Sequence, residues 1–269
     1  MLSRRFRWVS CQLEVLRQCF PSSVRGVLAD LPESLDKTYE RILQQIPKPN
    51  RLHAHRLFQC LVVAAYPLNV EELEKILAND SSATGMTTIL DEGLRWEDKE
   101  RAVLLVCSSL ITVVQDRGSR VIQFSHLSVK EFLTSNRLAA STVETLRYHH
   151  IALEPAHMMM TISCLKIMQQ GLKFNICGLK SSYEMNNEVE DIFGLVGRCI
   201  PSYLAYACQY WADHLRGIAS GEKRDSDILN LLRNFLDFHL LYWLEALSLL
   251  FRPHIASKSL LIAAEWLEV

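Results

Sequence analysis

The sequence predicts a mainly α-helical protein that carries one small β-hairpin. Apolar residues recur at helical spacing along most of the 269 residues, which is typical of helices with one face against a core. Two β-branched segments, Ile111 to Gln115 and Val121 to Phe124, instead have the period-two pattern of strands. They flank a glycine-containing turn at 116–119, and this arrangement indicates an antiparallel hairpin.

Length and charge limit the possible functions. A chain of 269 residues is long enough to bury a core and to form two or three sub-domains. Its formal net charge of -1 gives no basic field for nucleic acid and no acidic field for cationic partners. We therefore expect protein surfaces as partners.

The cysteines and the apolar stretches indicate a cytoplasmic protein. Eight cysteines occur without a C-x-x-C pair or regular spacing, and the first residues lack the apolar core of a signal peptide. Reduced thiols are the simplest interpretation. The longest apolar stretch, Ile228 to Phe251, contains Arg233, Asp237 and Glu245, and each charge costs about 2.5 to 3.5 kcal/mol at a bilayer centre. We expect no membrane span.

The first predicted helix is apolar on more than one side. One stripe consists of Phe6, Val9, Leu13, Leu16 and Phe20, and a second direction consists of Trp8, Val15 and Cys19. Such a helix needs neighbours on more than one side. If the chain starts at Met1, part of this surface lacks its partner.

Four further helices are predicted before the hairpin. Asp30, Pro32 and Glu33 are predicted to start a helix that ends before Pro47, and its apolar face is Leu35, Tyr39, Ile42, Leu43 and Ile46. A second helix runs from Ala54 to Ala65, and Asn69 with Glu72 caps a third. A fourth lies near Trp96 to Cys107 and leads into the hairpin.

The segment after the hairpin is predicted to be helical throughout. Ser128 and Glu131 form a capping box, which predicts a helix from Val129. The later predicted helices are His149 to Gln170, Glu188 to Phe193, Tyr203 to Leu215, Ile228 to Asp237, His239 to Phe251 and Ile255 to Leu267. Three helices followed by a hairpin and a helix, from about Asn50 to Arg137, have the order of a winged helix.

Seven segments carry a resemblance to a known family. They are Phe6 to Cys19, Leu31 to Leu43, Pro67 to Leu77, Cys107 to Val114, Phe124 to Leu133, Tyr203 to Leu215 and His239 to Leu250. With them the chain resembles the region that follows the nucleotide-binding core of fungal NACHT-type signalling NTPases, which are NLR-like STAND ATPases. The part from Tyr203 onward most resembles mushroom-type (basidiomycete-like) members, in which WD or other repeats usually follow.

The resemblance implies three parts. These are a helical segment at 1–48 that continues a NACHT core, a winged helix at 49–138 with the β-hairpin as its wing, and a C-terminal helical domain at 139–269. It also implies that the winged helix docks on the nucleotide-binding core. The expected partners are that core, other proteins and, in full-length relatives, a C-terminal repeat domain.

His126 is the candidate binding residue. It ends the second strand just ahead of a predicted helix N-terminus, where backbone N–H groups and the helix dipole favour an anion. In the wider class a Met-His-Asp motif closes the winged helix, and its histidine contacts the β-phosphate of ADP. The resemblance gives this role to His126, with Ser125 in place of the Met and Leu127 in place of the Asp. The alternative is a strand-end histidine bonded to a backbone carbonyl.

The sequence motifs do not indicate catalysis or metal binding. The nearest string to a P-loop, Gly217 to Lys223, has the wrong spacing, and no G-x-S-x-G nucleophile motif occurs, so we expect no catalytic residue. No cofactor is expected in this chain. ADP or ATP is expected to bind only if the NACHT core is present. The pairs His53/His55 and His149/His150 lack metal-ligand spacing and are expected to be partly exposed helix histidines.

The sequence also disfavours two other kinds of contact surface. DNA binding by the predicted third helix is disfavoured, because Glu97 to Arg101 contains three acids and two bases. The run Met158 to Met160 is expected to fill the core, with a pliable contact surface as the alternative. The sequence thus predicts a non-catalytic regulatory segment of a NACHT-type NTPase, or else a free-standing helical adaptor that binds a protein without nucleotide dependence.

Overall fold

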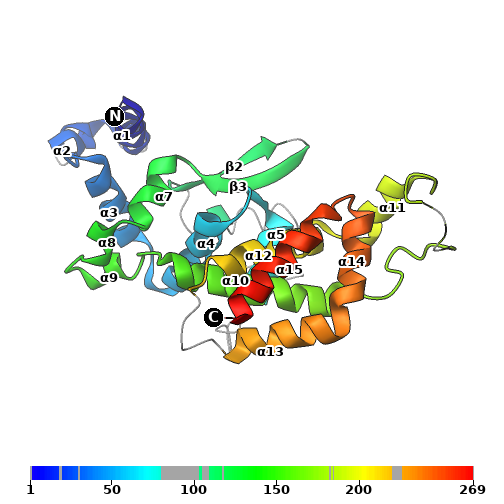
Figure 1. Cartoon of the computed structure of the whole chain (residues 1–269). Helices are drawn as coiled ribbons and strands as arrows, with labels where there is room; N and C mark the ends of the chain where they lie inside the picture. Colours follow the sequence, from blue (N-terminus) through cyan, green and yellow to red (C-terminus); the bar gives the residue numbers. More distant parts are fainter. Residues whose placement is uncertain are drawn as a thin grey trace. The chain divides into compact units, whose positions relative to one another are not determined.

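The computed structural model describes residues 2–17, 20–29, 31–79, 103–104, 109–116, 118–181, 183, 185–219 and 226–268 (Figure 1). These residues are mainly helical with a small β-structure, so the predicted fold class is confirmed at that level. Most of the predicted helix at Trp96 to Cys107 lies outside the described residues, and the winged-helix arrangement therefore stays a prediction.

The chain divides into two compact units. The first comprises Met1–Val62 and Ile89–Ala152, and the second comprises Val63–Thr88 and Leu153–Val269. Residues 63–88 therefore group with the C-terminal helices. The predicted three-part division at 48 and 138 does not coincide with these units and stays a prediction.

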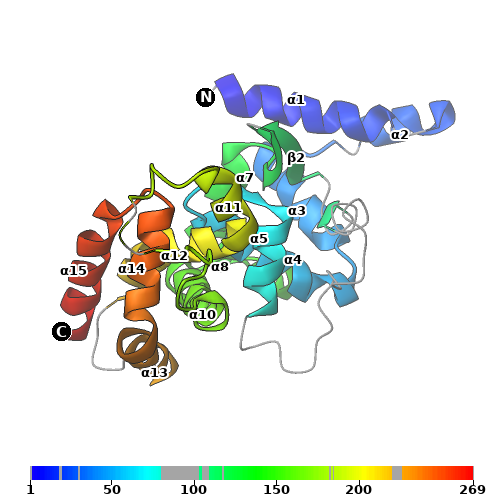
Figure 2. The same cartoon turned by 90° about the vertical axis from the view of Figure 1, so that its right-hand side faces the viewer.

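The first unit consists of short helices and the hairpin. Its helices are α1 (Leu2–Arg17), α2 (Val24–Ala29), α3 (Leu35–Gln45), α4 (Arg51–Val63), α7 (Leu127–Leu133), α8 (Asn136–Ala139) and α9 (Glu144–Arg147). Single 3-10 turns lie at Pro21–Ser23 and Lys48–Asn50. Figure 2 shows α1 and α2 following one another beside the hairpin. The buried core includes Tyr39, Leu43, Phe58, Ile122 and Leu133.

The start of α3 differs from the prediction. Ser34, rather than the Asp30 to Glu33 segment, is the N-cap, and its side chain accepts a hydrogen bond from the backbone N–H of Lys37. A serine oxygen in this position satisfies one of the N–H groups that a helix start leaves unpaired. The helix therefore begins at Leu35 and turns Tyr39 and Leu43 into the core.

The hairpin is confirmed. Strands β2 (Ile111–Asp116) and β3 (Ser119–Phe124) pair antiparallel, with Ile111 opposite Phe124 and Asp116 opposite Ser119. Gly118 in the turn has φ +90°, a conformation that glycine adopts without strain. The register turns Ile111 and Ile122 into the core.

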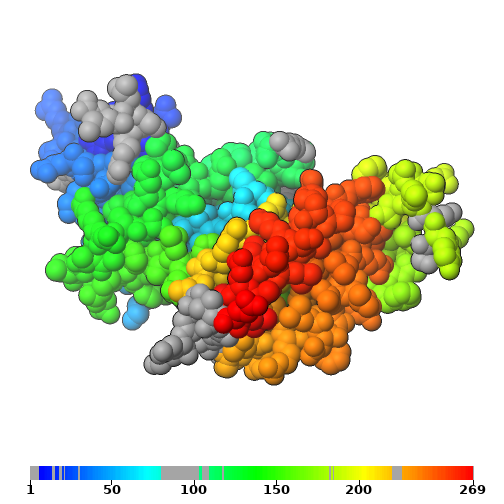
Figure 3. Space-filling model, viewed as in Figure 1, coloured from blue at the N-terminus to red at the C-terminus, as the bar shows by residue number. Residues whose placement is uncertain are grey.

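The second unit is a helical bundle. It contains the two-residue strand β1 (Leu68–Asn69), α5 (Val70–Ala78), α10 (Leu153–Gly171), α11 (Ile192–Cys199), α12 (Ser202–Arg216), α13 (Ser226–Asn234), α14 (Leu240–Leu249) and α15 (His254–Glu268). The π-helical turn η4 (Phe235–His239) joins α13 to α14. Helix α12 packs against α5, α10, α14 and α15. In the space-filling view, α14 and α15 form a continuous surface in orange and red (Figure 3).

An aromatic cluster lies at the centre of this unit. Trp211, Phe235 and Trp243 are fully buried, with ring centroids 5.2 to 6.0 Å apart. The indole N–H of Trp243 donates to the carbonyl of Cys208 at 2.8 Å. These three residues lie on helices that the sequence predicts, and they are buried in the core of the unit.

Two helices of the second unit start elsewhere than predicted. Helix α10 begins at Leu153 instead of His149, and Pro155 lies in its first turn, where a missing N–H is tolerated. Helix α11 spans Ile192–Cys199 instead of Glu188 to Phe193, because Asp191 is its N-cap and accepts from the N–H of Gly194. The predicted cap of α5 by Asn69 and Glu72 is confirmed.

None of the helices in the described part of the chain is long and apolar enough to cross a membrane. The cytoplasmic location stays a prediction. The hydrophilic connector predicted at 220–226 lies outside the described residues except for Ser226.

Candidate functional site

His126 is the N-cap of α7. Its backbone is extended, and its ring Nδ1 lies 3.1 Å from the backbone nitrogen of Ser128, whose N–H it accepts. The predicted capping box, with Ser128 as the cap and a helix from Val129, is therefore wrong. The helix starts two residues earlier because the imidazole nitrogen satisfies the N–H group that a serine or aspartate oxygen usually takes.

Ser128 instead links His126 to α3. Its hydroxyl lies 2.7 Å from His126 Nδ1 and 2.8 Å from the hydroxyl of Tyr39. Both Ser128 and Tyr39 are buried, and the Tyr39 ring packs on Phe132 of α7 with centroids 5.4 Å apart. Burial raises the pKa of Tyr39, although the contact with the Ser128 hydroxyl and the nearby Arg7 guanidinium act in the opposite direction. This contact fixes the first turn of α7 against α3.

Arg7 of α1 holds the residue before His126. Its Nη2 donates to Ser125 Oγ at 2.7 Å and to the carbonyl of Ser109 at 2.8 Å. The N–H of Ser125 donates to the carbonyl of Leu110 at 2.9 Å, which closes the hairpin end. Ser125 is therefore held by α1 through Arg7, and His126 is linked to α3 through Ser128 and Tyr39.

Arg7, Tyr39 and Ser128 were not predicted as site residues. Tyr39 was recognised only as part of an apolar face, and Ser128 only as a cap. The sequence signal is weak: Arg7 is one of four arginines in the first helix, and Tyr39 is a phenol on an otherwise aliphatic stripe. A buried tyrosine hydroxyl needs a polar partner, which is a reason to search for one.

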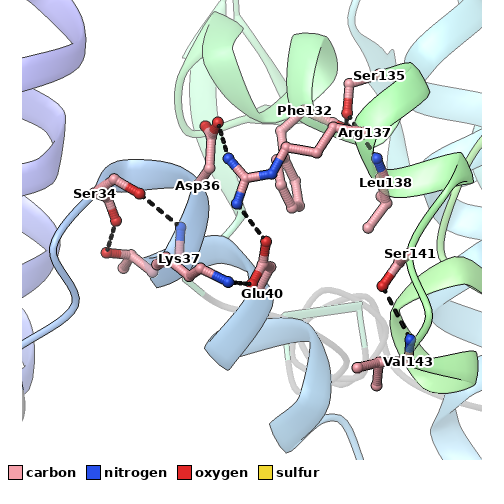
Figure 4. Close-up of polar contacts among 11 residues, drawn as sticks. Ser34, Asp36, Lys37, Glu40, Phe132, Ser135, Arg137, Leu138, Ser141 and Val143 are labelled. Atoms are coloured by element: carbon pink, nitrogen blue, oxygen red, sulfur yellow. Dashed lines mark hydrogen bonds and ion pairs between the residues drawn. The ribbon is translucent and has the colours of Figure 1, made fainter.

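A second polar cluster joins α3 to α8 (Figure 4). The guanidinium of Arg137 bonds Asp36 Oδ2 at 2.9 Å and Glu40 Oε1 at 2.6 Å, and Lys37 Nζ lies 2.7 Å from Glu40 Oε2. Partial burial alone would raise the pKa of Glu40, but the neighbouring Lys37 and Arg137 outweigh it, and the pKa is lowered. These side chains satisfy one another, so the cluster is a link between helices.

The predicted surface histidines include one buried residue. His149 is completely buried, in contrast to the expected partly exposed position, and its two ring nitrogens have no hydrogen-bond partner. Its ring contacts those of Phe58 and Tyr148. Burial, together with the charges of His55 and Arg51, lowers the pKa of His149 to about 4. His149 is therefore a neutral core residue.

The structure also shows where possible metal ligands and the methionine run Met158 to Met160 lie. Among the described residues no group of three His, Cys, Asp or Glu side chains could hold a metal ion. Met159 and Met160 are buried in α10, as expected of core filling, while Met158 is half-buried.

The His126 region offers donors for a phosphate but no complete nucleotide site. An imidazole N–H and the guanidinium of Arg7 are the types of group that bind phosphate oxygens. The backbone N–H of Ser128 donates to the His126 ring. The start of α7 therefore offers one N–H group fewer to an anion than the sequence predicts. A contact between His126 and a nucleotide phosphate stays a prediction.

Two curated relatives resemble the chain. It is 28% identical over 268 residues to the vegetative incompatibility protein HET-E-1 of Podospora anserina, covering 91% of this chain and 18% of that protein. It is 32% identical over 145 residues to the azaphilone pigments biosynthesis cluster protein L of Monascus ruber, covering 51% of this chain and 28% of that protein. This likeness supports a NACHT-related family. No family model and no solved structure matches the chain.

The chain spans less than a third of either relative. The likeness to HET-E-1 covers both compact units, whereas a winged helix and a basidiomycete-like origin stay predictions.

Proposed function

We propose that the chain is the non-catalytic regulatory segment of a NACHT-type signalling NTPase. In this role it docks on a nucleotide-binding core and holds the resting state. The observation that supports the proposal most is the likeness to HET-E-1 along 91% of the chain, which runs through the hairpin and the helices on both sides of it. Protein docking also agrees with the exposed apolar side chains of α1, which include Phe6, Val9 and Leu13.

His126 is the proposed contact to bound nucleotide in this assembly. ADP, when bound by the core, supplies a β-phosphate that accepts hydrogen bonds. In this chain His126 donates one such bond, and Arg7 and Tyr39 hold the segment that carries it. Because a ligand shifts an equilibrium only by its differential affinity, this bond favours the docked state when ADP is present.

The test uses the purified chain and a separately purified nucleotide-binding core from the same protein. The chain alone should show no micromolar ATP affinity in calorimetry and no ATP hydrolysis. The core should bind the chain more tightly with ADP than with a non-hydrolysable ATP analogue, by about tenfold for a difference of about 1.4 kcal/mol. Equal affinity in the two nucleotide states would favour the alternative, a helical adaptor without nucleotide dependence.

A further inference from the structure

The hydrogen bonds that lead to His126 run in one direction. The hydroxyl of Ser128 lies 2.7 Å from His126 Nδ1 and 2.8 Å from the hydroxyl of Tyr39. The backbone N–H of Ser128 can only donate, so Nδ1 is an acceptor and the Ser128 O–H is left to donate to it as well. Ser128 Oγ then accepts from the Tyr39 O–H.

The tautomer of His126 follows from the same contacts. The backbone N–H of Ser128 is a donor only, and it lies 3.1 Å from His126 Nδ1. Nδ1 therefore accepts from the hydroxyl and from the amide of the same residue. A neutral imidazole whose Nδ1 is an acceptor carries its proton on Nε2.

We infer that Tyr39 and Ser128 are positioning residues that hold His126 as the Nε2–H tautomer. The second half of the inference, that this N–H donates to a nucleotide phosphate oxygen, rests on the proposed function. The assignment of the tautomer does not. The support for the ring comes from Tyr39 on α3 and Ser128 on α7, while the position after His126, where related ATPases carry an aspartate, is an exposed leucine, Leu127.

The tautomer can be measured directly in the whole chain. Long-range proton–nitrogen NMR spectra of ¹⁵N-histidine-labelled protein at about pH 8, where imidazole is ordinarily neutral, distinguish Nδ1–H from Nε2–H. The chain has nine histidines, and His126→Gln identifies the signal of interest by its disappearance. We expect the Nε2–H pattern for His126. An Nδ1–H pattern in the unmodified chain would overturn the inference without any need for a variant.

Variants then test the positioning residues. Ser128→Ala and Tyr39→Phe should each raise the Nδ1–H to Nε2–H ratio of His126, roughly fivefold for the loss of one ordinary hydrogen bond. Ser128→Thr retains the hydroxyl and should restore the original ratio. Thr38→Val is the control, since Thr38 is a buried neighbour of Tyr39 that bonds Gln12 instead. It should leave the His126 signal unchanged.

The outcomes separate the two halves of the inference. If the ratio stays the same in Ser128→Ala and Tyr39→Phe, the backbone N–H alone fixes the ring, and the positioning roles are overturned. In a protein that also carries the nucleotide-binding core, Tyr39→Phe should weaken ADP binding in proportion to the Nε2–H fraction that is lost, by at most about fivefold. A changed tautomer with unchanged ADP affinity would overturn the phosphate-donor half and count against the proposed function, while leaving the tautomer assignment in place.

Discussion

His149 shows at the scale of a single residue how burial makes stability depend on pH. The unfolded chain binds a proton at His149 below about pH 6.5, whereas the folded chain does so only near its lowered pKa of about 4. Between these values the unfolded state holds more protons, so folding stability falls as the pH falls. The loss from His149 at about pH 5 should be about 2 kcal/mol.

The variant His149→Met should remove this contribution. Urea unfolding at about pH 7 and about pH 5 should show a smaller difference for the variant than for the original chain. His254→Met, at an exposed histidine of α15, is the matched control and should keep the original difference. A variant at position 149 with the same pH dependence as the original chain would show that the buried imidazole is not responsible.

The sequence identified His126 but not its partners. A histidine between a strand and a helix can be found from the pattern of neighbouring residues. The partner hydroxyl of Tyr39 is 89 positions away from Ser128, and Arg7 is 118 positions away from Ser125. Only the folded arrangement of α1, α3 and α7 brings these side chains together.

At the scale of elements, prediction succeeded where periodicity was long and failed where caps were unusual. Helices α12 and α15 were predicted to within two residues at each end, because their apolar spacing continues over several turns. The start of α7 was misplaced because Ser128 and Glu131 match a capping box, while histidine is not a usual N-cap. Helix α11 was misplaced because its cap, Asp191, lies in the left-handed region at φ 49°.

The hairpin turn offers a prediction at this scale. A Cβ at Gly118 would meet nothing within 4 Å, so Gly118→Ala should be unfavourable only through its φ of +90°. We expect a loss of about 1 kcal/mol of unfolding free energy in denaturant titration. Gly197→Ala in α11, which also has open space but no positive φ, should instead be neutral or stabilising by up to about 1 kcal/mol. Equal effects at both positions would argue against the turn geometry.

The link between α3 and α8 should be weak despite its short distances. The Arg137 side chain is 48% exposed, and solvent screens such pairs. Arg137→Met should cost about 0.5 to 1 kcal/mol at low salt and less at high salt. Arg198→Met, which removes a longer and more exposed pair with Asp191, should have no measurable effect in the same unfolding experiment. A large loss for Arg137→Met at high salt would contradict this interpretation.

At the scale of the whole molecule, the exposed apolar side of α1 should cause self-association. Phe6 is 72% exposed and Leu13 48% exposed, on the stripe that the sequence predicted. Because contiguous exposed apolar surface favours association, the chain should form larger species as its concentration rises in sedimentation experiments. Replacing Phe6 and Leu13 together by Gln should shift it toward monomer, while Leu261→Gln on α15 should not. A monomer at high concentration in the original chain would contradict the prediction.

In the proposed function His126 links bound ADP to the docked state, so the dissociation rate of ADP should depend on this residue. The measurement compares the original protein with His126→Ala, each carrying the nucleotide-binding core, and records the melting temperature of both. A hydrogen bond to a charged group contributes roughly 1.5 to 3 kcal/mol, so ADP should leave about ten- to a hundredfold faster from the variant. Unchanged ADP release together with a lowered melting temperature would show that His126 only caps α7, and would contradict the account.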